Sequence, residues 1–180
     1  MGPSLKSIIK NRYSLISNQP SVMNLAIQIA NQFREVQLNG NWVSTNLKVQ
    51  LSDVSWKEAT TKIGSLNTIA ALTFHINYYI AGVNQVLEGG SLDIRDKYSF
   101  NLPPIESEED WQKLLNKVWH DAEKFADLVE ELPDEKLMTG FVDKKYGSYY
   151  RNILAMIEHS YYHLGQIVLL KKLIKEGTFK

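Results

Sequence analysis

The chain has 180 residues, 44% of them hydrophobic and 22% charged, a composition typical of one globular domain that folds without disulfides. The charges of its 20 basic and 20 acidic residues cancel, and the basic residues form no block, so we do not expect nucleic acid as a partner. Cysteine is absent, so disulfides, thiolate ligands and a cysteine nucleophile are excluded as well. Because no apolar run approaches about 18 residues and the N-terminus lacks a signal-peptide core, we expect one cytoplasmic domain spanning 1–180, with no membrane partner.

The first part of the chain predicts an N-terminal arm and one long helix. Apolar residues at helical spacing predict a short helix or arm over residues 1–18. Pro20 and Ser21 are a helix-start signal, and an apolar stripe reaching Val36 predicts a helix of about five turns, ended at 39–41. Residues 41–66 follow as a long connection, in which Ser55 begins a capping-box pattern that predicts a helical turn over 56–62.

A second long helix is predicted from Asn67 to the glycines at 89–90. His75 falls on its apolar stripe, where an unpartnered polar ring would be costly to bury. Two interpretations are open for this residue on its own. It is either a buried histidine satisfied by a backbone carbonyl or a tyrosine, or a ligand in a site shared with another helix.

Two more helices are predicted after a polar connection over 91–104. Ser107 and the acidic residues behind it begin a helix that ends near Leu132, and His120 lies on its polar face, so we exclude His120 from any site. The short segment 134–147 leads to Ser148, the expected cap of a last helix from Tyr149 to about Lys175. Together the pattern predicts an all-α protein, a four-helix bundle with long connections.

The last helix carries His159 and His163, which are four residues apart and therefore lie on one face. Such a pair also arises for packing, so by itself it is a weak signal of a metal site. If the second and last long helices are neighbours, His75 can join the pair. Three neutral nitrogens would then surround one cation and leave positions open for water or substrate.

Two stretches of the chain resemble the DinB/YfiT-like superfamily of metalloenzymes. They are 65–76, which leads into His75, and 158–167, where His159, His163, a Gly-Gln pair and an aliphatic residue follow in order. The resemblance implies a four-helix bundle without a simple up-down order, and a divalent metal on His75, His159 and His163. It also implies an activity of the thiol-dependent S-transferase type, with a small-molecule substrate and a low-molecular-weight thiol.

A cation held by three neutral imidazoles keeps its full charge, so it lowers the pKa of a bound water or thiol and offers a nucleophile at neutral pH. Imidazoles suit several metals, and we expect zinc or nickel first, with iron or manganese as alternatives. Tyr79, Tyr162 and Gln166 are candidates for the pocket, although each also fits a satisfied core position. Glu158 is rotated by about 100° from His159 on the helix and is a poor general base.

Three functions are therefore compatible with the sequence. The first is a metal-dependent S-transferase or hydrolase acting on a small molecule. The second is a bundle that binds a metal or small ligand without turnover, with Tyr149 or Tyr150 as exposed aromatic residues for a homodimer. The third is a structural helical protein whose buried histidines bind nothing, and the convergence of three histidines on core stripes counts against it.

Overall fold

The computed structural model describes residues 24–40 and 43–177, and in this part of the chain the structure is all-α. The arm predicted over 1–18 and the helix start predicted at Pro20 lie outside the described residues. Within them the first helix begins at Leu25, and Asn24 is its N-cap, since the Asn24 side chain accepts a hydrogen bond from the Ala26 amide at 2.8 Å. The α-helices are α2 (Leu25–Gln37), α3 (Leu47–Leu51), α4 (Trp56–Thr60), α5 (Ile69–Leu87), α6 (Glu108–Glu130), α7 (Asp134–Leu137) and α8 (Tyr149–Glu176).

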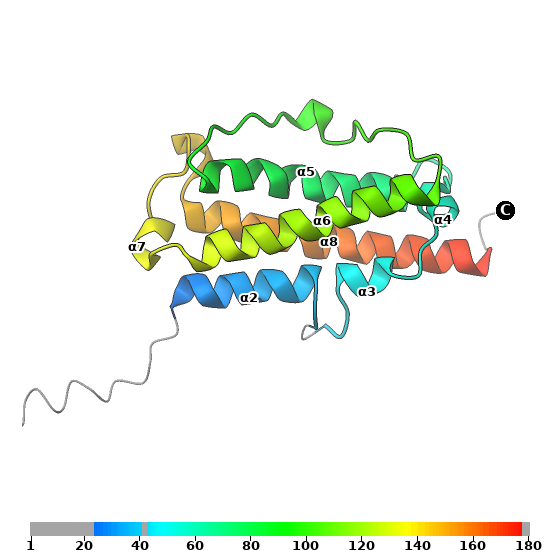
Figure 1. Cartoon of the computed structure of the whole chain (residues 1–180), viewed down its shortest axis with the longest axis horizontal. Coiled ribbons are helices and arrows are strands. Elements are labelled where there is room, and N and C mark those ends of the chain that lie inside the picture. Colours follow the sequence, from blue (N-terminus) through cyan, green and yellow to red (C-terminus); the bar gives the residue numbers. More distant parts are fainter. Residues whose placement is uncertain (1–23, 41–42, 178–180) are drawn as a thin grey trace, which may run out of the picture.

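The longer helices α2, α5, α6 and α8 lie side by side around a shared apolar core (Figure 1). Helices α2 and α5 each contact both α6 and α8. Inside, the rings of Phe33 on α2 and Phe125 on α6 pack against each other with centroids 4.2 Å apart and an interplanar angle of 38°, and both side chains are fully buried. This packing follows from the apolar stripes, because each helix can bury its stripe only against its neighbours.

The connection between α2 and α5 is ordered by short helices and by contacts with the rest of the fold. The predicted helical turn is confirmed as α4, and the capping box is present: the Ser55 amide donates to the Glu58 carboxylate at 2.8 Å. Helix α3 was not predicted, because five residues are too few to show a periodic pattern. Lys171 and Lys175 of α8 bind the Asp53 carboxylate, and these hydrogen bonds lower the pKa of Asp53 to about 2.

The connection over 88–107 runs back along the length of α5, so that α5 and α6 point in the same direction (Figure 1). It contains one 3-10 turn, Asp96–Tyr98. Tyr78 holds it in place, because its hydroxyl donates to the Arg95 carbonyl at 3.0 Å and accepts from the Arg95 amide at 2.8 Å. The connection therefore covers α5 and brings loop residues close to the middle of that helix.

Among the described residues, no helix combines the length and the apolar character needed to cross a bilayer.

Candidate metal centre

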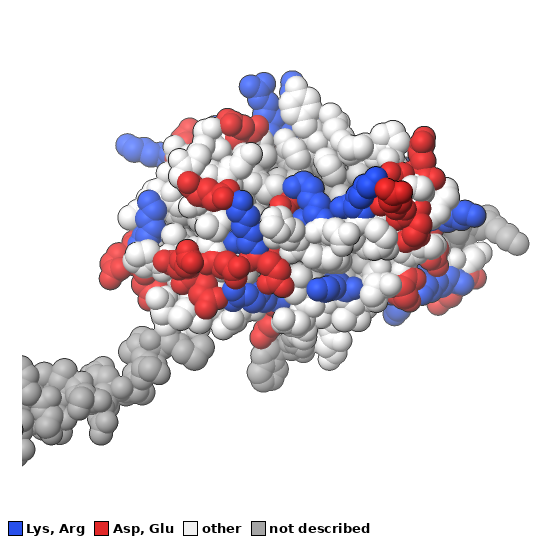
Figure 2. Space-filling view, viewed as in Figure 1, with Lys and Arg blue, Asp and Glu red and all other residues white. Residues whose placement is uncertain are grey.

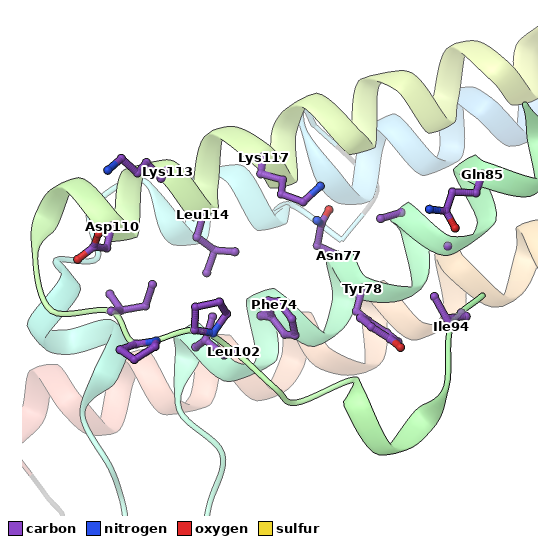
Figure 3. Close-up of a pocket in the computed structure, with 15 residues that line it drawn as sticks. Phe74, Asn77, Tyr78, Gln85, Ile94, Leu102, Asp110, Lys113, Leu114 and Lys117 are labelled. Carbon is purple, nitrogen blue, oxygen red and sulfur yellow. The ribbon is translucent and has the colours of Figure 1, made fainter. Parts of the chain in front are cut away.

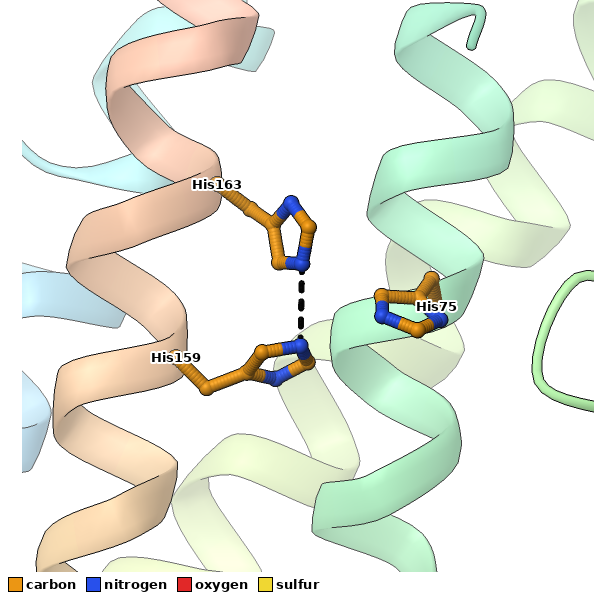
Figure 4. A group of neighbouring side chains, drawn as sticks. All are labelled: His75, His159 and His163. Atoms are coloured by element: carbon orange, nitrogen blue, oxygen red, sulfur yellow. Dashed lines mark hydrogen bonds between the residues drawn. The ribbon is translucent and has the colours of Figure 1, made fainter. Parts of the chain in front are cut away.

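The three predicted histidines come together where α5 packs against α8 (Figure 4). The ring centroid of His75 lies 4.9 Å from that of His159 and 4.9 Å from that of His163, and the α8 pair is 4.5 Å apart. One possible ligand atom from each ring can be chosen so that all three lie within 4.8 Å of one another. The arrangement expected from the spacing is therefore present in the fold.

Local structure explains how the rings converge. His159 and His163 are four positions apart on α8, which places both rings on the face that meets α5. His75 and His163 are only 8% and 6% exposed, and His159 is half-buried. The helices that carry them are capped at their starts by Thr68 and Ser148, whose side chains accept from backbone amides of the first turn.

Hydrogen bonds to the outer nitrogens orient two of the rings. His163 Nδ1 lies 2.8 Å from Gln166 Oε1, and His75 Nδ1 lies 3.3 Å from the Ser99 carbonyl oxygen. Because both oxygens can only accept, each Nδ1 carries the hydrogen and each Nε2 carries the lone pair. This is the tautomer that metal-binding histidines take when a carbonyl or amide orients them from behind.

His159 and His163 face each other through their Nε2 atoms, which are 2.9 Å apart (Figure 4). Since His163 Nε2 is an acceptor, His159 Nε2 donates the shared hydrogen. To bind a metal through Nε2, His159 would carry its hydrogen on Nδ1 instead. A metal with bonds of about 2.05 Å at tetrahedral angles needs nitrogens about 3.3 Å apart. The pair would open by about 0.4 Å, and the other separations, none above 4.8 Å, would close by at most about 1.5 Å. The donor set fits a divalent cation.

All three histidines have lowered pKa values. Burial is the main cause at His159, and the neighbouring His163 and His75 add to it, so that the pKa of His159 falls to about 4. Burial also lowers the pKa of His75 and of His163. The rings are therefore neutral at neutral pH, which is the form that binds a metal.

The connection over 88–107 supplies further residues to the site. Phe100 stacks on the His75 ring at 3.9 Å with an interplanar angle of 11°. Tyr79 places its ring edge-on to both His75 and His159, 5.2 Å from each, and its hydroxyl donates to Asp96 Oδ1 at 3.1 Å. Sequence reasoning missed Asp96, Ser99 and Phe100, because a connection without periodicity gives no signal of which helix face it will cover.

The other predicted positions divide into those at the site and those away from it. Tyr79 and Gln166 contact the histidines, and the Tyr162 ring lies 4.8 Å from His163, although Tyr162 is 66% exposed. Glu158 is paired with Arg151 at 2.9 Å. His120 is exposed, as predicted.

The exposure expected for Tyr149 and Tyr150 is wrong. Both side chains are half-buried and pack against the core, and the Tyr149 ring meets Phe141 edge-on at 5.1 Å. They occupy the first turn of α8, where the helix crosses the end of the segment 134–147. They therefore do not provide the free aromatic surface on which the homodimer prediction was based.

A cavity of about 280 Å³ lies one helical turn from the histidines, and it is lined in part by Leu72, Gln166 and Leu170. Gln166 belongs to both features, because its Oε1 accepts from His163 while its side chain lines the cavity. Leu72 precedes His75 by three residues on α5, which corresponds to about 4.5 Å along a helix. Space for part of a small molecule thus adjoins the site.

Comparison of the chain with family models, with curated proteins and with solved structures gave no significant match.

Proposed function

We propose that the four longer helices form a bundle of the DinB/YfiT-like type, which holds a divalent cation on His75, His159 and His163. The single observation that carries this proposal is the convergence of the three neutral imidazoles, two of them oriented by Ser99 and Gln166 so that their Nε2 atoms carry the lone pairs. Zinc or nickel suits such a nitrogen site, and iron or manganese are alternatives.

The function that this site supports best is activation of a thiol or a water for transfer to a small molecule or for hydrolysis. When bound, the cation supplies a positive charge that lowers the pKa of the nucleophile. The residues of the chain supply the rest. Phe100 shields one face of His75, and the Tyr79 ring lies edge-on to His75 and His159 while its hydroxyl donates to the Asp96 carboxylate. The hydroxyl can therefore take a proton from the bound thiol or water as it passes its own proton to Asp96. The cavity beside Gln166 accommodates the substrate.

One observation favours an alternative, a bundle that binds a metal without turnover. Among the described residues, the hydrogen-bond partners of the imidazoles are a backbone carbonyl, an amide and one another, so no carboxylate is hydrogen-bonded to them. Asp96 is hydrogen-bonded to Tyr79 instead. If the Tyr79 and Asp96 pair does not exchange protons, the site lacks a general base.

Elemental analysis of protein purified without a metal-affinity tag tests the metal. We expect close to one equivalent of a divalent metal in the wild type and in His120→Ala, and a large loss in His163→Ala. Equal metal content in all three proteins, or none in the wild type, would contradict the proposal. His120 is a suitable control because it is exposed and lies on α6.

A screen of small thiols against electrophiles, and of ester and amide substrates, then separates the enzyme from the binder. Turnover that is lost in His163→Ala and reduced in Tyr79→Phe supports the enzyme. The absence of turnover in metal-loaded wild-type protein across the panel supports the non-catalytic alternative.

A further inference from the structure

A larger cavity, of about 550 Å³, lies between α5, the first half of α6 and the connection over 88–107 (Figure 3). His75 is not among the residues that line it. Its volume is within the range of about 300–1,000 Å³ that small-molecule sites occupy. Its walls are mainly apolar, and they include Phe74, Ala81, Gly82, Ile94, Leu102 and Leu114.

Small side chains and a fixed connection keep this cavity open. Ala81 and Gly82 offer almost no side-chain volume on the face of α5 that the connection crosses. Ile94 sits so close to Gly82 that a Cβ atom at this glycine would lie 2.5 Å from Ile94 Cγ2. Next to that contact, Tyr78 makes two hydrogen bonds with the backbone of Arg95. The connection is thus tied to α5 at one end of the cavity, and the space beside it is preformed.

The rim of the cavity on α6 carries two lysines. Lys113 and Lys117 are four residues apart on one helix face, where like charges repel each other. Figure 2 shows basic side chains over α6 next to a largely uncharged area. The acidic residue of the rim, Asp110, already accepts from the Ser107 hydroxyl at 2.7 Å and from the Glu106 amide at 3.2 Å. Of the charged residues that line the cavity, two are basic and one is acidic, and the acidic one is already hydrogen-bonded, so the lining favours an anion over a cation.

Both lysines have hydrogens to spare for a ligand, because an ammonium group carries three. Lys113 is 2.8 Å from Glu109, but both side chains are largely exposed, and such pairs contribute little. Lys117 donates to Asp121 at 2.7 Å, and Asp121 also accepts from Asn77 Nδ2 at 2.8 Å. The buried carboxylate of Asp121 thus keeps a partner when Lys117 turns toward a ligand.

We propose that this cavity binds an anionic amphiphile, a molecule with an apolar body and one carboxylate or comparable acidic head group. The body lies against Phe74, Ala81 and Leu114, and the head group lies at the rim between Lys113 and Lys117. None of the three histidines lines this cavity, so its test is separate from that of the metal site.

The test uses the full chain and the anionic dye 8-anilinonaphthalene-1-sulfonate, with displacement by decanoate and by 1-decanol. We expect saturable fluorescence in the wild type, and decanoate should displace the dye at a concentration two- to fivefold lower than decanol. Ala81→Trp, which fills the cavity, should weaken dye binding at least tenfold. Ala155→Trp is the matched control, because Ala155 is a half-buried residue of α8 and should leave binding unchanged.

The variant Lys113→Gln tests whether this lysine binds the head group. It should weaken the binding of decanoate two- to fivefold and leave the binding of decanol unchanged. Equal binding of decanoate and decanol to the wild type would overturn the anionic class, and dye binding by Ala81→Trp as tight as by the wild type would overturn the site. If Ala81→Trp does not fold, the binding site can be located from the changes in amide chemical shift that decanoate causes in isotope-labelled wild-type protein. Decanoate should move the signals of Ala81, Gly82 and Ile94, and shifts confined to other regions would refute the proposal.

Discussion

Replacing Gln166 by leucine tests whether the hydrogen bond behind His163 prepares the metal site. Gln166 Oε1 is 2.8 Å from His163 Nδ1, and it holds the hydrogen on that nitrogen so that Nε2 carries the lone pair. Leucine has a similar size but cannot accept. The ring of His163 can then take the other tautomer or turn, and both changes remove a lone pair from the site. Losing an orienting partner of this kind typically weakens metal affinity about 10- to 100-fold.

The size of the effect follows from linkage. At a free metal concentration about 1,000 times the wild-type Kd, binding stabilises the folded state by about 4.1 kcal/mol. The variant should retain about 1.4–2.7 kcal/mol under the same conditions, a loss of about 1.4–2.7 kcal/mol. For a chain of this length each kcal/mol changes Tm by about 2–4 °C, so the metal-induced rise in Tm should be smaller by about 3–11 °C.

The assay is thermal unfolding of metal-free protein with and without added zinc, for the wild type, Gln166→Leu and Gln112→Leu. Gln112 is an exposed glutamine of α6 that donates only to Glu108, so its variant should show the full wild-type rise. An unchanged zinc-induced rise in Gln166→Leu would refute the orientation argument. An equal decrease of the zinc-induced rise in Tm in Gln112→Leu would show that the effect does not come from the histidine site.

Three other predictions concern the histidines, a helix cap and the core. The metal-free protein should lose stability as the pH falls from about 6.5 toward 4, because the unfolded chain protonates His159 near its ordinary pKa of 6.5 while the folded chain does so only near pH 4. Urea unfolding at several pH values should show this slope. His159→Gln should reduce the slope without removing it, because the pKa values of His75 and His163 are lowered too. The hydroxyl of Ser107, the N-cap of α6, accepts from the Asp110 amide at 3.1 Å. Ser107→Ala should therefore lower the free energy of unfolding by about 1 kcal/mol, and Ser91→Ala in the connection is a control that should leave it unchanged. Phe125→Ala should lower the free energy of unfolding, measured by chemical denaturation, by about 3–5 kcal/mol, because the ring is fully buried against Phe33. A decrease below about 1 kcal/mol would contradict the described packing.

The helices that carry the histidines could be predicted because their signals are local. Apolar residues three and four apart follow from the pitch of the α-helix, and a serine cap acts on amides within three residues of itself. The caps at Ser55, Ser107 and Ser148 are accordingly where the sequence places them. The pairing of His159 with His163 has the same origin, because their four-residue spacing determines a common face in any α-helix.

Predictions were weaker wherever position depended on a partner distant in the sequence. The start of the first described helix is one case, since its N-cap is Asn24 and the first-turn amides of Leu25 and Ala26 also donate to Asp134, more than 100 residues away. The exposure expected for Tyr149 and Tyr150 is another, because the segment 134–147 folds back against the start of α8. Neither contact leaves a periodic pattern in the sequence.

The sequence by itself determined the all-α class, the faces of the helices and the identity of the three histidines, because these depend on helix pitch and on residue chemistry. Only the tertiary structure decided that α5 packs against α8 so that His75 meets the other two rings. It also decided that one connection places Ser99 and Phe100 on His75 while leaving a cavity over Ala81 and Gly82. The path of an aperiodic connection is set by the contacts it makes with distant helices, and such contacts exist only once the chain has folded.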